Sequence, residues 1–250
     1  MHSSRECNQL DDNLCRSCGA PEAVIAIGID ASGAFSARQK QSVRNAIFDA
    51  IGLNPDGRGF DRELARNDRL DVYLLNASGD ELLEPVISRC NPGTPQGLQR
   101  FVENERRAQR LYEEQFFGAI ERAIDEVASE EEASTSPLAE SIVAMAETSF
   151  AERSDNQLNT LIVVTDMLQN SANWSFYSRG VTDYSAFRAS EGYAHARGDF
   201  RSANVCFLRI TRTTMQEVAM QTPRMLDWWA DYVADNDGEY VPHCETEFRL

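Results

Sequence analysis

Apolar residues along the chain fall first into short, nearly continuous runs of the length of strands. Five segments show this pattern, several of them rich in the β-branched residues that favour sheets: Val24–Asp30, Leu70–Asn76, Leu82–Arg89, Leu158–Thr165 and Ala203–Ile210. The turn signal Ala-Ser-Gly-Asp at residues 77–80 separates the second segment from the third and predicts a β-hairpin. The run at 158–165 is almost wholly apolar, so we expect that strand to be buried on both faces of a sheet.

Between these segments, apolar side chains recur every three to four residues, which predicts amphipathic helices. The predicted helices cover about residues 37–51, 98–127, 137–150 and 214–234, with a break near Pro223. Ser136 precedes Pro137 and is placed to cap the third helix. Strands that alternate with helices, plus one hairpin, predict an α/β fold with three layers. Its sheet is mainly parallel with one antiparallel edge strand, and helices cover both faces.

The domain organisation follows from where the periodic pattern starts. Residues 1–22 are polar and contain cysteine, with no periodicity, and are expected to form an N-terminal tail. Residues 23–250 are expected to form a single domain.

The net charge and the hydropathy of the chain bear on whether nucleic acid or a membrane is an expected partner. The chain has 24 basic and 40 acidic residues, a formal net charge of −16. A field of this sign repels phosphate backbones, so nucleic acid is not an expected partner. No apolar run approaches the roughly 20 residues needed to cross a bilayer, so no membrane span is expected.

The six cysteines leave the redox compartment open. Cys15 and Cys18 have the spacing of half a zinc site, which Cys7, His2 or Cys244 would have to complete. Disulfides in an exported protein and free thiols are the alternatives, and Cys206, inside an apolar strand, is expected to be a small core residue. The first 19 residues lack the pattern of an intact signal peptide. We therefore expect a cytoplasmic protein, the alternative being an exported one whose leader has been removed.

Two strands end in aspartate, and this is the strongest chemical signal in the sequence. Asp30 follows the first strand and Asp166 follows the strand at 158–165. The carboxyl ends of parallel strands meet at one edge of a sheet, where ligand sites of open α/β folds collect. Carboxylates and hydroxyls gathered there are the ligands of a hard divalent cation. The alternative is that each aspartate caps the helix that follows it.

The order of these parts resembles a von Willebrand factor type A (vWA) domain over roughly residues 23–235. The most specific motifs are Asp30-Ala31-Ser32, Ser136-Pro137-Leu138 and Thr165-Asp166. The resemblance implies a metal-ion-dependent adhesion site that binds Mg²⁺ or Mn²⁺, with Asp30, Ser32, Ser136 and Asp166 as ligands. It also implies a binding module for another protein, one of whose acidic side chains completes the cation's shell.

One ligand of that site departs from the family pattern. The position of the second serine is occupied by Ala34, and Ser36 lies two residues later. A bent loop with Ser36, or water, would have to replace the missing hydroxyl. The alternative is a metal-free scaffold of the same fold for the assembly of a complex.

Aromatic residues just after Asp166 are candidate partner contacts. Trp174, Phe176 and Tyr177 lie in a polar stretch and are residue types enriched at interface hot spots. The alternative is that they fold back as a small core over the sheet. Three short segments, 90–93, 168–171 and 228–232, are similar to bacterial vWA-like proteins associated with plasmids and other mobile genetic elements.

Enzymatic activity is not expected. None of the three histidines lies in a motif with serine or cysteine, and no glycine-rich phosphate loop is present. No catalytic residue is therefore predicted. A metal-dependent hydrolase that uses Asp30 and Asp166 to activate water is the less favoured alternative.

Overall fold

A computed structural model describes residues 9–17, 19–32, 35–53, 64–75, 83–93, 105–128, 135–151, 157–181, 183–242 and 247–249. The elements are β1 (Ala23–Ile29), α1 (Ala37–Ala50), β2 (Arg69–Leu74), β3 (Ile87–Cys90), α2 (Glu105–Arg110), η3 (Leu111–Phe117), α3 (Gly118–Val127), α4 (Leu138–Ser149), β4 (Leu158–Thr165), α5 (Phe176–Arg179), α6 (Tyr184–Arg188), η4 (Glu191–His195), β5 (Ala203–Thr211), α7 (Met215–Met220), α8 (Pro223–Asp235), β6 (Gly238–Tyr240) and β7 (Glu247–Arg249).

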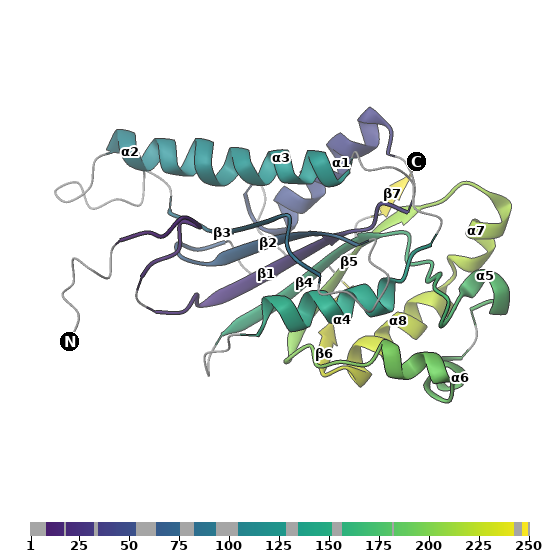
Figure 1. Ribbon diagram of the computed structural model, residues 1–250. Helices are drawn as coiled ribbons and strands as arrows, with labels where there is room; N and C mark the ends of the chain where they lie inside the picture. The colour runs from purple at the N-terminus through teal and green to yellow at the C-terminus, as the bar shows by residue number, and fades with distance from the viewer. Residues whose placement is uncertain are drawn as a thin grey trace.

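The strands form one twisted sheet in the order β3-β2-β1-β4-β5-β6, with β7 paired to the end of β5 (Figure 1). Every described pairing is parallel except β2–β3, so β3 is the antiparallel edge strand. The predicted α/β fold is confirmed. β3 is shorter than the predicted strand, and the hairpin turn lies outside the described residues.

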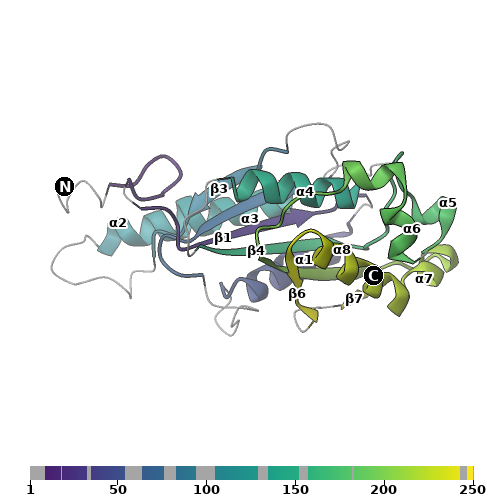
Figure 2. The same cartoon turned by 90° about the horizontal axis from the view of Figure 1, so that it is seen from below.

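Helices cover both faces of the sheet, as predicted. Helices α1 and α3 lie on one face and α4 and α8 on the other (Figures 1 and 2). The side chains of β1 divide between these layers because successive residues of a strand point to opposite faces. Val24 and Ala26 belong to the core under α4 and α8, whereas Ile25, Ile27 and Ile29 belong to the core under α1 and α3.

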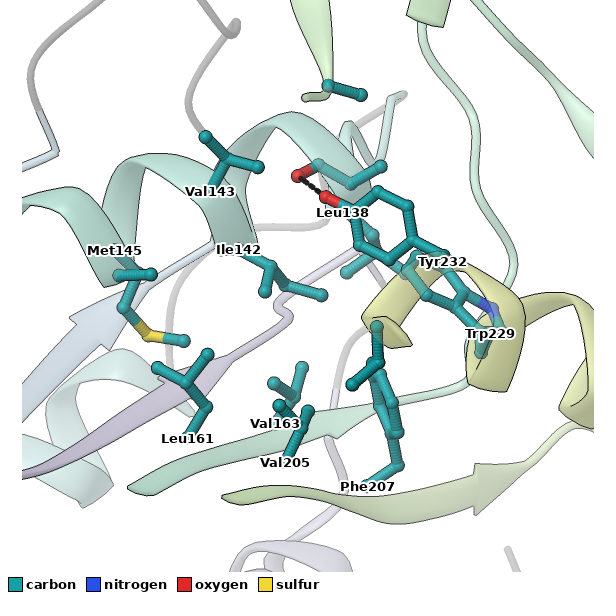
Figure 3. Packing of buried hydrophobic residues seen from close by; sticks show 14 of the residues in the cluster. Leu138, Ile142, Val143, Met145, Leu161, Val163, Val205, Phe207, Trp229 and Tyr232 are labelled. Atoms are coloured by element: carbon teal, nitrogen blue, oxygen red, sulfur yellow. Dashed lines mark hydrogen bonds between the residues drawn. The ribbon is translucent and has the colours of Figure 1, made fainter. Parts of the chain in front are cut away.

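The core under α4 and α8 is rich in aromatic side chains, and Figure 3 shows three of them, Phe207, Trp229 and Tyr232, packed among aliphatic residues. Trp229 and Tyr232 of α8 are fully buried, and the Tyr232 hydroxyl donates to the Ala139 carbonyl at 2.7 Å. The Trp229 indole donates to the Met167 carbonyl at 2.9 Å. The Tyr232 hydroxyl and the Trp229 indole N–H therefore each have a backbone carbonyl as hydrogen-bond acceptor. Both carbonyls belong to segments that adjoin the carboxyl edge of the sheet.

Two predicted helices differ from the structure in detail. The helix expected at 98–127 is described from Glu105 onward and contains the π-helical stretch η3. The helix expected at 214–234 divides at the predicted break into α7 and α8, with Pro223 at the start of α8. None of the described helices combines the length and apolarity that a bilayer crossing requires.

The described part of the N-terminal tail is attached to the sheet. A disulfide joins Cys15 to Cys90 at the end of β3, and the Cys90 amide donates to the Asn13 carbonyl at 2.9 Å. Cys206 is also disulfide-bonded, so it is not merely a small core residue as predicted. All three cysteines among the described residues are thus in disulfides, and neither a zinc ligand nor a free thiol is found among them.

Candidate functional site

The predicted site lies at the carboxyl edge of the sheet, where the strand order reverses. The chain proceeds from β1 outward to β2 on one side, and β4 and β5 lie on the other side. The loops after β1 and β4 therefore diverge, and ligand sites of open α/β sheets form in the crevice between them. We call the polar side chains gathered here the rim: Asp30, Ser32, Ser136, Thr165, Asp166 and Arg212.

Asp30 is the centre of a buried hydrogen-bond cluster. Its Oδ1 accepts from the Ser32 amide at 2.9 Å. Its Oδ2 accepts from the Ser136 hydroxyl at 3.2 Å and from the Thr165 hydroxyl at 2.8 Å. Three loops that are distant in sequence are therefore joined at one carboxylate.

Asp166 pairs with a positive charge that follows β5. Its Oδ2 accepts from Arg212 Nε at 2.6 Å, and its Oδ1 accepts from the Leu168 amide at 2.8 Å. Arg212 Nη2 also lies 3.5 Å from the Ser32 hydroxyl. The guanidinium thus contacts the loops after both β1 and β4.

The two carboxylates are close enough to influence each other's ionisation. Burial and, to a smaller extent, the charge of Asp30 raise the pKa of Asp166 to about 6, against the lowering effect of Arg212. Burial also raises the pKa of Asp30, against the lowering effect of its bonds to Ser32 and Thr165. Among the described residues, the compensating charge is the guanidinium of Arg212, whose own pKa is raised by Asp166 although burial lowers it.

The structure brings together all four predicted ligand residues, but their arrangement does not suit a divalent cation as it stands. Both Asp30 oxygens already accept hydrogen bonds, and the outer oxygen of Asp166 holds Arg212. Oxygen donors of the right kind are present. A metal ion would have to displace the guanidinium to reach them, so the Mg²⁺ or Mn²⁺ prediction stays a prediction, with Arg212 as the observation against it.

Ser36 and Ser136 have other roles than the sequence suggested. Ser36 caps α1, accepting from the Gln39 amide at 3.4 Å, so it does not replace the hydroxyl missing at Ala34, which lies outside the described residues. Ser136 does not cap α4 with its side chain, because it donates to Asp30 instead. Asp30 and Asp166 do not cap helices either, since the helices that follow them, α1 and α5, begin at Ala37 and Phe176 with Ser36 and Ser175 as their N-cap residues.

The loop after Asp166 is held by a buried carboxylate. Glu140 of α4 accepts from Gln169 Nε2 at 2.8 Å and from the Ser171 hydroxyl at 2.6 Å. Gln169 Oε1 in turn accepts from the Ala139 amide at 2.9 Å. These hydrogen bonds hold the start of the loop that follows Asp166 against the first turn of α4, and they therefore restrain the position of Asp166.

The three predicted partner contacts divide into two kinds. Trp174 and Phe176 are buried against the helical layer, with Phe176 packed edge-on against Trp228 and Trp174 against Phe187. Their position is that of the small-core alternative. Tyr177 is 39% exposed, and its hydroxyl lies 3.4 Å from Glu217 of α7.

An exposed apolar surface adjoins the rim. Met215 and Val218, on one side of the short helix α7, are 91% and 50% exposed, and no residue of α7 is buried. Helix α7 begins three residues after Arg212 and lies next to α5, which contains Tyr177 (Figures 1 and 2). We call Tyr177, Met215 and Val218 the α5–α7 surface.

Two rim residues were not predicted from the sequence. Thr165 directly precedes Asp166, and a hydroxyl beside an aspartate at the end of a strand is a signal that the sequence offers for it. Arg212 gave no such signal, because an arginine just after an apolar strand is common on protein surfaces. Its role depends on the parallel pairing of β4 with β5, which brings the two strand ends together.

The hydrolase alternative would need further metal ligands beside the two rim aspartates. No three His, Cys, Asp or Glu side chains in the described part of the chain cluster as metal ligands. His195, the histidine among the described residues, is exposed in η4.

Comparisons with known proteins give only remote structural similarities. No protein-family model and no curated protein matches the sequence. Proximal thread matrix protein 1 from the mussel byssus is similar over 90% of this chain and 44% of its own, with 9% identity and a TM-score of 0.38. The pilus adhesin SpaC from Lactobacillus rhamnosus GG is similar over 92% of this chain and 29% of its own, with 9% identity and a TM-score of 0.42. The chain spans less than half the length of either protein.

Proposed function

We propose that this chain is a protein-binding module whose partner docks on the rim and on the adjoining α5–α7 surface. The observation that carries the proposal is the exposure of Met215 and Val218 next to an ordered cluster of charged residues. Exposed apolar side chains in a group, bordered by polar residues, are typical of protein interaction sites. Isolated ones need no such explanation.

The chemistry of the rim supports a partner with an acidic side chain. Arg212 donates to Asp166 and lies at the limit of hydrogen-bond distance from Ser32, and its other N–H groups have no acceptor among the described residues. Its side chain is 17% exposed, so a ligand can reach it. A guanidinium binds a carboxylate through paired N–H groups. We therefore propose that Arg212 binds the partner's acidic side chain, which would otherwise complete the shell of a metal ion, and this favours the metal-free form of the module.

Two apolar residues of equal exposure allow a matched test of docking on the α5–α7 surface. Val218 on the α5–α7 surface and Leu158 at the opposite end of β4 are both 50% exposed. With a photo-crosslinking amino acid at either position, we expect a discrete adduct from position 218 alone in an extract of the source cells. Once the adduct is identified, Val218→Asp should weaken binding of that purified protein at least about tenfold, because an aspartate is left desolvated in the interface.

Leu158→Asp is the matched control, since it introduces the same charge at the same exposure away from the rim. Binding equal to wild type is expected for this variant. Equal loss in both variants, or the same adduct from both positions, would contradict docking on the α5–α7 surface.

We also propose that the chain folds in an oxidising compartment, instead of the cytoplasm expected from its sequence. The support is the disulfide state of Cys15, Cys90 and Cys206. Disulfides persist in secreted, periplasmic or surface proteins and are rare in the cytosol.

A further inference from the structure

We infer that Arg212 is the resident cation of the rim, and that its guanidinium takes the place that a divalent metal would otherwise occupy. Removing it should convert the rim into a site for Mg²⁺ or Mn²⁺. This inference concerns the chain alone and does not depend on any partner.

The first support is the number of groups that the guanidinium joins. Its Nε lies 2.6 Å from Asp166 Oδ2 and its Nη2 lies 3.5 Å from Ser32 Oγ. The charge of Arg212 also acts on Asp30. A cation that contacts the loops after β1 and β4 pairs with Asp166 and offsets part of the repulsion between two neighbouring carboxylates when both are ionised.

The second support is that the backbone of Arg212 is held in place. The Arg212 amide donates to Gln221 Oε1 at 2.8 Å. The side-chain nitrogen Nε2 of the same Gln221 donates to the Asp166 carbonyl at 3.0 Å and to the Ile210 carbonyl at 2.8 Å. Gln221 therefore bridges the end of β5 to the residue that Arg212 neutralises. The pairing is built into the fold and is not a chance encounter of surface charges.

The third support is the set of oxygens that would be released. Without the guanidinium, Asp166 Oδ2 and the Ser32 hydroxyl lose their positive neighbour, while Ser136 and Thr165 keep Asp30 in position. Two carboxylates and several hydroxyls make a donor set that a hard cation can use together with water. Ser36 caps α1, so water would supply the missing ligand.

The test measures Mn²⁺ binding to the full chain by calorimetry and by electron paramagnetic resonance of free Mn²⁺. Wild type should show no saturable binding up to about 1 mM, and Arg212→Gln should bind one Mn²⁺ at least about tenfold tighter than wild type. Adding Asp30→Asn to that variant should abolish the binding. Arg201→Gln, at the opposite end of β5, makes the same change in net charge and should behave as wild type.

Two results would overturn the inference. One is saturable Mn²⁺ binding by wild type that Asp30→Asn removes, since the guanidinium would then not exclude the metal. The other is a folded Arg212→Gln protein that binds no Mn²⁺. If the glutamine variant does not fold, Arg212→Met replaces it, and the wild-type measurement stands without either variant.

Discussion

Replacing Arg212 with alanine is expected to lower the free energy of unfolding by about 3 kcal/mol at pH 7. The substitution leaves the carboxylate of Asp166, whose side chain is 3% exposed, without its partner at 2.6 Å. Removing one member of a buried ion pair lowers the free energy of unfolding by more than the intact pair contributes to it, because the remaining charge is desolvated and uncompensated. Urea denaturation of wild type and variant measures the difference.

The pH dependence of this loss identifies its cause. The folded-state pKa of Asp166 is raised to about 6, and the loss of Arg212 raises it further. A carboxyl whose pKa is higher in the folded state binds its proton more readily there, so stability falls as pH rises through that pKa. The stability deficit of Arg212→Ala should therefore shrink as the pH falls toward about 6 and be smallest below it, where Asp166 is protonated in both folded proteins.

Arg201→Ala is the control, with an expected change within about 0.5 kcal/mol. A deficit in Arg212→Ala that is independent of pH would point to lost packing instead of an unpaired carboxylate. That result would contradict the electrostatic account of the rim.

The second large effect concerns the disulfide between Cys15 and Cys90. The double substitution Cys15→Ala/Cys90→Ala is expected to lower the free energy of unfolding by about 4 kcal/mol. The bond closes a long loop, with a sequence separation of 75, and so restricts the unfolded chain. Denaturant unfolding of the oxidised wild type and the double variant measures the loss.

Comparison of reduced wild type with the double variant separates the contribution of this bond from that of the disulfide that contains Cys206. Reduction of wild type should destabilise it at least as much as the double substitution, because Cys206 is also disulfide-bonded. Native wild-type protein in which Cys15 and Cys90 react as free thiols would contradict both the pairing and the proposed oxidising compartment.

The fold could be predicted because its signals are local. The strands β1, β4 and β5 are apolar runs, and α1, α4 and α8 have clear helical periodicity. The strands β6 and β7 have three residues each, too few for a periodic pattern to show. The π-helical stretch η3 keeps the amphipathic spacing of its surroundings, so composition alone did not reveal it.

The site could be predicted only in part, because its parts come from distant segments. Asp30 and Asp166 were found from their positions at strand ends, and the structure places them together. The role of Arg212 requires knowing that β5 lies beside β4. The burial of Trp174 likewise depends on Phe187, Trp228 and other aromatics of the helical layer, contacts that no local pattern contains.

The most direct test of the account is a high-resolution crystal structure grown with Mn²⁺ and recorded at the manganese absorption edge. We expect the Arg212 guanidinium to lie against Asp166 and Ser32, with no anomalous peak between Asp30 and Asp166. A manganese peak bound by both carboxylates, with the Arg212 side chain turned away, would contradict the account and restore the adhesion-type metal site.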